Sequence, residues 1–321
     1  MGPAAEHSNP ETSTPCVWAI VLNWNLYEET VQCIEGLLSQ SYPNMKVLLV
    51  DNGSMDGSPE KLRERFRDIE VIENRKNLGY AEGNNVGIRR ALEGGADYLF
   101  IINNDALAEK DAVERLVECA ERNPAIAVVG AKTLLYTDPS VIYGAWGVKN
   151  YRNVVTRIEG ENCPDGERYE MERDVDYVLG CAFLVRGEAA RRVGLMDPEY
   201  FAYHDELDWC ERLRKEGWRV VFSPGARVLH RGSLSLKRAG ASLARDYFLA
   251  RNSVRFIKKH GNTLQQVKFF TFVLLATVLK TPLEAGRGRL RAHLERTRGY
   301  LDGIRARPLT PEILQRLRLD K

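Results

Sequence analysis

The sequence lacks paired cysteines, a strong excess of either charge and an apolar run long enough to span a bilayer. Its six cysteines form no CxxC pair, which argues against a zinc knuckle or a redox dithiol and fits a reducing cytosol better than a disulfide framework. Lys and Arg number 46 against 44 Asp and Glu, so the net charge of +2 favours no polyanionic partner and we expect no nucleic-acid binding. The longest apolar stretch, residues 269–279, falls short of the roughly 20 residues that cross a membrane.

Three regions are distinguished by composition. Residues 1–15 are polar, contain no apolar block and are predicted to form a disordered tail, not a signal peptide. Residues 16–235 carry the strand and helix patterns of one globular domain, with a regular half at 16–133 and a less regular half at 134–235. Residues 236–321 are basic and mostly helical in pattern, so we expect a C-terminal helical extension.

In the first half, apolar strand patterns alternate with helical patterns. The first helix is expected to start at Asn25, with Glu28 completing a capping box. Strands that alternate with helices predict an α/β fold with a mostly parallel sheet covered by helices on both faces. The predicted strands span residues 17–23, 46–51, 69–73, 98–103 and 126–131, and the predicted helices include 79–92 and 110–122.

The second half is less periodic. Residues 135–175 carry Gly, Pro, Asn and charges, and they are predicted to form irregular loops around a short hairpin. Regular patterns then return as a buried strand at 176–186, a helix at 204–217 and two short strands at 218–224 and 226–230.

Polar side chains follow several of the predicted strands. One such strand end could be a simple turn, but four in series predict a shared crevice, because parallel α/β sheets bind ligands at the carboxyl ends of their strands. The residues are Asn23, Asn25, Asp51, Asn52, Asn74 to Asn77, and Asn103 to Asp105.

Two motifs allow either a structural or a ligand-binding interpretation. In residues 51–58, the Asn-Gly and Asp-Gly pairs are turn formers, whereas Asp51 at a strand end can also accept hydrogen bonds from a base or a ribose. In residues 77–87, Gly79 and Gly83 would let the backbone approach a ligand or let a helix pack closely on the sheet. This second motif does not follow the first strand and lacks a Lys-Ser/Thr pair, so neither a dinucleotide fingerprint nor a Walker loop is indicated.

Several ionisable residues could carry chemistry. Asp105 could be a ligand of a divalent cation that is bound mainly by a diphosphate, or its side chain could form an Asx turn. Asp205, Glu206 and Asp208 compete for a general-base role, although the helix dipole alone favours acids in a first helical turn. His230 ends a strand, where a lone histidine is either structural or a metal ligand.

The order and spacing of the motifs resemble family 2 glycosyltransferases of the GT-A fold, in the branch of rhamnosyltransferases and galactofuranosyltransferases. The resemblance covers about residues 16–260 and implies a Rossmann-like, mostly parallel sheet flanked by helices. It also implies inverting transfer of a sugar from a nucleotide diphosphate donor with a divalent metal, Mn²⁺ or Mg²⁺. The motifs are VLNWN, LLVDNGSMDGS, NLGYAEGNNVGI, FIINNDA, GCAFLVR, YFAYHDELDWCERLRKEGW and VLHRGS.

The resemblance implies roles for individual residues. Glu206 stands at the position of the catalytic base, in an acidic pair that relatives usually write Glu-Asp or Asp-Asp, and Asp205 is the alternative base. Asp105 ends the family's Asp-x-Asp position, which here reads Asn-Asn-Asp, and would hold the metal together with His230. Asp51 would bind the nucleobase. The residues expected to bind or border the nucleotide are Asn23, Asn25, Asp51, Asn77, Gly79, Asn84 and Asn103.

The implied function is a cytoplasmic glycosyltransferase of cell-surface polysaccharide synthesis. Its donor would be a dTDP- or UDP-sugar, with dTDP-rhamnose as a candidate, and its acceptor a glycan or a lipid-linked sugar. The C-terminal helices are expected to contact the inner face of the cell membrane peripherally, or to pack on the catalytic core or on another subunit of a homo-oligomer.

Two other functions compete with this one. A sugar-nucleotide pyrophosphorylase needs a Gly-rich, basic loop after the first strand, where this chain has NWNLYEET. The alternative that stays open from the sequence is a non-catalytic relative that binds a sugar nucleotide or serves as an assembly subunit.

Overall fold

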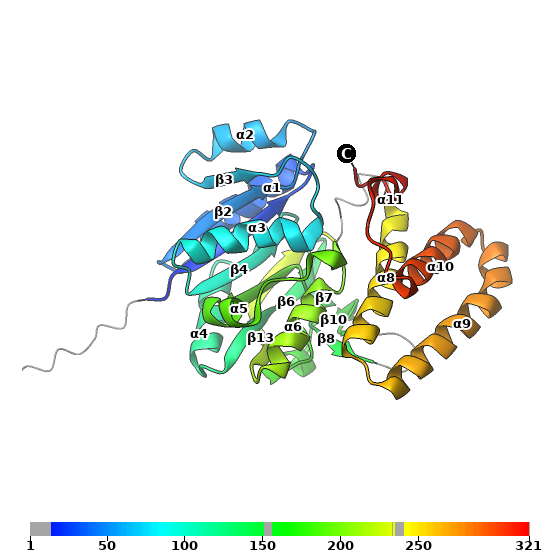
Figure 1. The fold of residues 1–321 in the computed structure, drawn as a ribbon. Coiled ribbons are helices and arrows are strands. Elements are labelled where there is room, and N and C mark those ends of the chain that lie inside the picture. Colours follow the sequence, from blue (N-terminus) through cyan, green and yellow to red (C-terminus); the bar gives the residue numbers. More distant parts are fainter. Residues whose placement is uncertain (1–13, 151–155, 233, 235–240, 321) are drawn as a thin grey trace, which may run out of the picture.

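The computed structural model describes residues 14–150, 156–232, 234 and 241–320 (Figure 1). Most of the expected N-terminal tail, residues 1–13, therefore lies outside the described residues.

The first half of the chain builds the parallel part of the sheet. Strand β1 lies between β2 and β4, and β3 forms the edge beyond β2, all four in parallel. Apolar residues fill β1, β2 and β4 because both faces of the sheet are covered there, whereas the edge strand β3 is only partly buried. The strands are β1 (Val17–Asn23), β2 (Met45–Asp51), β3 (Glu70–Glu73) and β4 (Tyr98–Asn103), and the helices between and after them are α1 (Tyr27–Leu38), α2 (Ser58–Arg65), α3 (Gly79–Glu93) and α4 (Ala112–Glu121).

The two faces of the sheet pack against different helices. In β1, Trp18 and Ile20 belong to a core shared with α3, α5 (Gly187–Val193) and α6 (Asp205–Lys215), whereas Val17, Ala19 and Val21 join a core shared with α1, α2 and α4. This alternation follows from the two-residue period of a strand. The helix-covered sheet predicted from the sequence is confirmed, and Figure 1 shows α3, α5 and α6 on the same face.

The predicted start of the first helix is wrong. Helix α1 begins at Tyr27 with Leu26 as its N-cap residue, and no side chain caps it. Asn25 instead adopts a left-handed backbone with φ of 55°, and its Oδ1 accepts a hydrogen bond from Met55 N at 2.7 Å. Asn25 therefore contacts a distant loop and forms no local capping box. Its left-handed backbone is possible because Asn tolerates this region better than most residues.

The second half adds antiparallel strands to the sheet. Strand β12 (Ala182–Arg186) lies antiparallel between β4 and β6 (Ile126–Leu135), so the predicted strand at 176–186 is shorter than expected. The two short strands predicted at 218–224 and 226–230 form one strand, β13 (Arg219–His230), which runs parallel to β6 with a register shift between Ser223 and Arg227. Pro224 and Gly225 lie in that shift and bend the strand instead of ending it.

The segment predicted as irregular loops contains short strands. The hairpin of β8 (Trp146–Lys149) and β9 (Thr156–Glu159) agrees with the expected hairpin, and residues 151–155 between them lie outside the described part. The remaining elements of the segment are β7 (Asp138–Gly144), β10 (Cys163–Pro164), η1 (Glu167–Tyr169) and β11 (Arg173–Asp174).

Within the described residues from 241 onward there are four helices, in agreement with the predicted helical extension. They are α8 (Ser242–His260), α9 (Thr263–Gly286), α10 (Leu290–Ile304) and α11 (Pro311–Arg316). In Figure 1, α8 lies beside the part of the chain that forms the sheet, α9 lies farthest from it, and α10 lies between these two. Val254, Phe256 and Ile257 of α8 join the same core as α6, which fixes α8 against the rest of the chain.

Helix α9 corrects the estimate of apolar length made from the sequence. The apolar run at 269–279 extends within a 24-residue helix, which by length and composition alone could cross a membrane. Only 11% of its most apolar 18-residue window is buried. The helix therefore presents an apolar surface that the described part of the chain leaves largely uncovered.

Candidate active site

A cavity of about 290 Å³ lies where the sequence predicts a crevice, beyond the carboxyl ends of β1, β2 and β4. Leu22, Asn52 and Asn103 mark these three strand ends in its wall, and residues of α3, α6, β13 and α8 close it. Its lining includes seven of the predicted site residues, which are Asn77, Gly79, Asn103, Asp105, Asp205, Glu206 and His230.

Asp105 and His230 meet at this cavity although 125 residues separate them. Strand β13 pairs antiparallel with β5 (Ala106–Ala108), and the register places His230 opposite Ala106, next to Asp105. His230 Nε2 lies 3.1 Å from Asp105 Oδ1, and both side chains are 4% exposed. The long strand that the sequence divides in two is thus the element that delivers the histidine.

Asp105 is held in its charged form. Burial alone would raise its pKa, but hydrogen bonds from His230 and from the Leu234 N–H bring the pKa below its ordinary value. Asn103 Nδ2 lies 3.5 Å from His230 Nε2. The other ring nitrogen, His230 Nδ1, is buried with no hydrogen-bond partner among the described residues. One carboxylate, one imidazole and one amide thus converge on the cavity.

The acidic pair at the start of α6 forms another part of the wall. Asp205 is 1% exposed, whereas Glu206 is half-buried and more open to the cavity. Burial raises the pKa of Asp205 well above its ordinary value, and the neighbouring charge of Glu206, to which Asp205 is hydrogen-bonded, raises it further. Burial also raises the pKa of Glu206. The pair therefore retains a proton more readily than two exposed carboxyls would.

Asp205→Asn should make the folded protein less sensitive to alkaline pH. A carboxyl whose pKa is raised on folding keeps a proton that the unfolded chain releases, so its contribution to stability is lost as pH rises through the folded-state pKa. The amide has no proton to lose. We expect the stability of the variant to fall less than that of the wild type between pH 5 and pH 8. Urea unfolding at both pH values measures this, and parallel pH profiles of the two proteins would contradict it.

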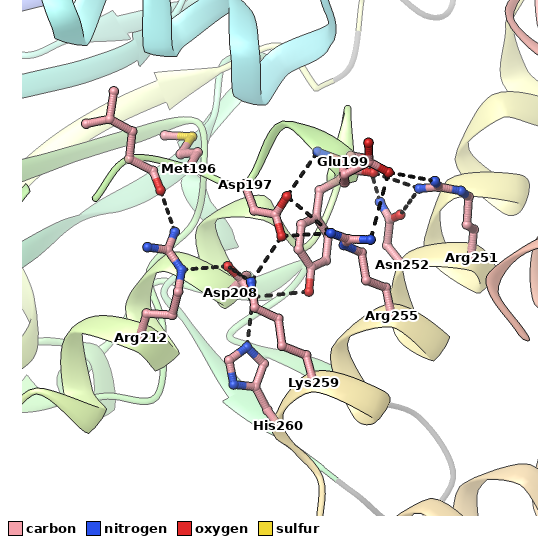
Figure 2. A network of polar contacts seen from close by, with 12 residues as sticks. Met196, Asp197, Glu199, Asp208, Arg212, Arg251, Asn252, Arg255, Lys259 and His260 are labelled. Atoms are coloured by element: carbon pink, nitrogen blue, oxygen red, sulfur yellow. Dashed lines mark hydrogen bonds and ion pairs between the residues drawn. The ribbon is translucent and has the colours of Figure 1, made fainter. Parts of the chain in front are cut away.

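Asp208, the third acid of this helix, has a different environment. It is fully buried, and its oxygens accept hydrogen bonds from Arg212 at 2.8 Å and Lys259 at 3.1 Å, with His260 Nε2 at 2.7 Å (Figure 2). Burial would raise its pKa, but these three partners lower it far below the ordinary value. Asp208 therefore ties α6 to α8 and is not among the residues that line the cavity.

The start of α3 forms the side of the cavity near Asn52. Asn52 Nδ2 donates to Asn77 Oδ1 at 3.0 Å and to the Gly79 carbonyl at 3.1 Å. Asn77 Nδ2 in turn donates to the carbonyl of Leu319, a residue that also lines the cavity. Amide side chains thus join the turn before α3 to the C-terminal segment.

Gly79→Ala is expected to destabilise the protein by about 2–4 kcal/mol. Gly79 has φ of +80°, and an added Cβ would lie 2.5 Å from the Phe201 carbonyl oxygen. The left-handed backbone costs a non-glycine residue roughly 1–2 kcal/mol, and the clash adds to that. Gly95→Ala is the matched control, because Gly95 has the same φ of +80° but open space around the added Cβ. Chemical denaturation measures both, and equal losses would show that the clash with Phe201 is absorbed.

Four predicted nucleotide-binding residues are not among those that line the cavity: Asn23, Asn25, Asp51 and Asn84. The oxygens of Asp51 accept from Asn23 Nδ2, the Ser54 hydroxyl and the N–H groups of Gly53 and Ser54. The turn interpretation of this motif therefore describes the observed contacts, and nucleobase binding by Asp51 stays a prediction. Asn23 also accepts from Thr30 and Asn104, and it joins β1 to its neighbours.

Sequence reasoning missed the aromatic part of the cavity wall. Tyr143, Tyr177 and Tyr203 line it, as do Trp24 and Phe201. Tyr143 packs edge-on against His230 with ring centroids 4.6 Å apart. Tyr143 comes from the segment without periodicity, so no pattern marked it, whereas the aromatic run before the acidic pair was a visible signal.

Comparison with known proteins identifies the family. Residues 18–186 match the family model described as glycosyl transferase family 2, which is more than half of the chain. The chain belongs to glycosyl transferase family 2. The sequence-based assignment to this family and to its rhamnosyltransferase-like branch is thereby confirmed, and the chain is a glycosyltransferase.

Two relatives illustrate the position of this family 2 glycosyltransferase. It is 32% identical over 218 residues to an N-acetylglucosaminyl-diphospho-decaprenol L-rhamnosyltransferase of Mycobacterium tuberculosis, covering 62% of this chain and 70% of that one. It is 24% identical over 303 residues to the dTDP-rhamnosyl transferase RfbF of Shigella flexneri, covering 90% of this chain and 98% of the relative.

Solved structures support the fold of this glycosyltransferase. A mannosyltransferase from Pyrobaculum calidifontis in complex with GDP-Man and Mn²⁺ superposes with a TM-score of 0.55 at 16% identity, covering 90% of this chain and 88% of that one. GalNAc-T7 with UDP, GalNAc and Mn²⁺ gives 0.58 at 15% identity, covering 76% of this chain and 51% of the other. The predicted GT-A architecture is confirmed.

Proposed function

We propose that this glycosyltransferase moves a sugar from a nucleotide diphosphate donor to a glycan or lipid-linked acceptor, with inversion at the anomeric carbon and with a divalent metal. The observation that carries the proposal is the convergence of Asp105, His230 and Glu206 on one cavity. The first two residues supply ligands for a cation, and the third supplies a base.

Asp105 and His230 fit a metal site in which the protein supplies only part of the ligands. A carboxylate oxygen and an imidazole nitrogen lie 3.1 Å apart, and the described residues contain no group of three or more His, Cys, Asp or Glu side chains that could hold an ion. Two protein ligands leave positions for diphosphate oxygens, and a carboxylate with an imidazole suits Mn²⁺ as well as Mg²⁺. When bound, such a metal stabilises the negative charge that develops on the departing diphosphate.

Glu206 suits the role of general base. It is the more open member of the acidic pair, and burial raises its pKa, which strengthens it as a proton acceptor near neutral pH. The acceptor hydroxyl oxygen would form a bond to the anomeric carbon as the bond from that carbon to the diphosphate oxygen breaks. Glu206 would take the hydroxyl proton, and the diphosphate would leave with the electron pair.

The donor that we propose is a dTDP-deoxysugar, with dTDP-rhamnose as the first candidate. Support comes from the names of the two relatives and from the aromatic and aliphatic side chains near the acidic pair, which suit a sugar that carries a methyl group. A thermal-shift series of dTDP, UDP and GDP with and without Mn²⁺ tests the base and the metal together, because a ligand that binds only the folded state raises Tm.

Release of nucleoside diphosphate is the decisive test of the proposal. The wild-type protein should release dTDP from dTDP-rhamnose when an acceptor bearing N-acetylglucosamine on a polyprenyl diphosphate is present, and chelation should abolish the release. Unchanged turnover in excess EDTA would remove the metal from the proposal. Binding of a donor without turnover on any acceptor would favour the assembly role.

The exposed face of α9 supports a peripheral contact with the inner surface of the membrane that carries such an acceptor. Its side chains are apolar and more than half exposed, and Lys268 and Lys280 lie on the same helix. Apolar side chains next to basic ones bind anionic lipid surfaces. The exposed residues are Leu264, Val267, Leu274, Leu275, Val278, Leu279 and Leu283.

Flotation with vesicles that contain phosphatidylglycerol tests this contact. We expect the wild-type protein to float and the double variant Leu274→Gln, Leu279→Gln to float several-fold less, because both leucines are more than 60% exposed on α9. Met55→Gln is the control, since Met55 is 77% exposed but lies far from α9 in the chain. A wild-type protein that stays at the bottom, yet runs as a dimer on gel filtration, would assign the face to a second copy.

A further inference from the structure

The loop that leads into the acidic pair has an unusual backbone. Phe201, Tyr203 and His204 have φ values of 61°, 67° and 66°, although none is glycine. L-residues rarely adopt this region, and they persist there only where the surrounding structure holds them. The loop ends at Asp205, and Phe201, Ala202 and Tyr203 line the cavity. Some part of the molecule must therefore fix this segment for Asp205 and Glu206 to face the cavity.

Other elements supply that restraint through the carbonyl groups of the loop. The Phe201 carbonyl accepts hydrogen bonds from the N–H groups of Tyr80 and Ala81, at the start of α3. The Glu199 carbonyl accepts from Arg251 Nη1 at 2.7 Å. All five consecutive carbonyls, from Glu199 to Tyr203, accept from an element outside the loop, and the remaining three share one donor.

That donor is the side-chain amide of Asn252 on α8. Its Nδ2 lies 2.8 Å from each of the carbonyl oxygens of Tyr200, Ala202 and Tyr203. Asn252 is completely buried, and its Oδ1 accepts from Arg251 Nη1 at 3.3 Å. An amide nitrogen carries two N–H groups, so at least one is shared between two carbonyls. In Figure 2, Arg251 and Asn252 project from α8 toward the segment that carries Glu199.

We infer that Asn252 is a positioning residue for the transfer reaction, through which the C-terminal helical region sets the backbone that carries Glu206. This inference rests on the proposed function, because it assigns to Asn252 an effect on the step in which Glu206 takes a proton. Neither Asn252 nor its helix partner Arg251 is among the residues that line the cavity, so the effect passes through the loop. The C-terminal region is then part of the catalytic apparatus, although its sequence carries no catalytic motif.

Asn252→Ala and Asn252→Asp test the inference. The first removes the donor, and the second replaces it with carboxylate oxygens that face three carbonyl oxygens. We expect kcat to fall by about 10²-fold, as for other small displacements of catalytic groups, with the donor KM within about two-fold of the wild-type value. Rates are normalised to the number of donor-binding sites from calorimetry, so that a smaller folded fraction does not count as a loss of kcat.

Tyr247→Phe is the matched control on the same helix. It removes a buried hydrogen bond of 2.9 Å to Asp302, which joins α8 to α10, and it leaves the loop contacts in place. Hydrogen exchange provides a readout that needs no activity. Exchange of the peptides spanning 199–209 should accelerate in the Asn252 variants and stay at the wild-type rate in Tyr247→Phe.

The outcomes separate the two proposals. Asn252 variants that keep wild-type kcat and wild-type exchange at 199–209 would overturn the positioning role. Equal losses of kcat in Tyr247→Phe would also overturn it, since any weakening of α8 would then suffice. If the wild-type protein transfers no sugar but the exchange difference appears as expected, the proposed function is wrong. Asn252 would then have only a structural role, in fixing the loop.

Discussion

Glu206→Gln should lower kcat by about 10²- to 10⁴-fold and leave donor binding nearly unchanged. This is the range that a positioned general base contributes to a proton transfer, and the amide cannot accept the hydroxyl proton. Glutamine has the same shape, so the wall of the cavity and the start of α6 should persist. Single-turnover release of nucleoside diphosphate measures the chemical step, and calorimetry with the intact donor measures binding.

Asp205→Asn is the internal control for this prediction. Asp205 is nearly inaccessible, its Oδ2 has no hydrogen-bond partner within the described structure, and its side chain is hydrogen-bonded to Glu206. Asp205 keeps its proton and is hydrogen-bonded to Glu206, which lowers the pKa of Glu206, and the amide of Asp205→Asn can still donate to that carboxylate. The variant should therefore retain most of the activity, with little change in the acid limb of its kcat profile. If Asp205→Asn is inactive and Glu206→Gln is active, the base is Asp205 and the assignment moves by one residue.

The sequence predicts the sheet and the strand ends of the site well, for a physical reason. Buried parallel strands appear as continuous apolar runs, and a polar residue at the end of such a run has few alternatives to the edge of the sheet. Asn103 and Asp105 were predicted at the cavity on this basis, and they line it. Asn104, between them, also lines the cavity, and its amide nitrogen donates to Asn23 Oδ1 and Thr30 Oγ1, which joins this strand end to β1 and α1.

The sequence fails where distant contacts decide the local conformation. Asn25 is a residue type that often caps helices, but its side chain accepts a hydrogen bond from the N–H of Met55 in another loop. Pro224 and Gly225 look like a break between strands, yet the chain continues in β13 because β6 and β5 supply partners on both sides. The contact of Asn252 with the loop before α6 spans about 50 residues and has no periodic signature. These features depend on tertiary pairing, which one-dimensional patterns do not contain.

The proposed metal makes the second large prediction. Asp105→Asn should lower kcat/KM by about 10³-fold, because a bound cation supplies several kcal/mol of stabilisation to the developing diphosphate charge and each 1.4 kcal/mol is about ten-fold. The amide keeps the size of the side chain and can still accept from Leu234 N, which lies 3.3 Å from Asp105 Oδ2. The change thus removes mainly the negative charge beside His230.

A thermal-shift measurement tests the role of this charge without any turnover. The quantity compared is the Tm of the protein with nucleoside diphosphate and Mn²⁺, minus its Tm with nucleoside diphosphate alone. This difference should be present in the wild type, nearly absent in Asp105→Asn and strongly reduced in His230→Ala, because a ligand shifts stability only in proportion to its affinity for the folded state. Asp111→Asn is the control, since this carboxylate pairs with Arg115 at the surface of α4 and is 44% exposed. A Tm difference that survives in both site variants would mean that the cation is held elsewhere, and the hydrogen bond between Asp105 and His230 would then serve only to join β13 to the turn after β4.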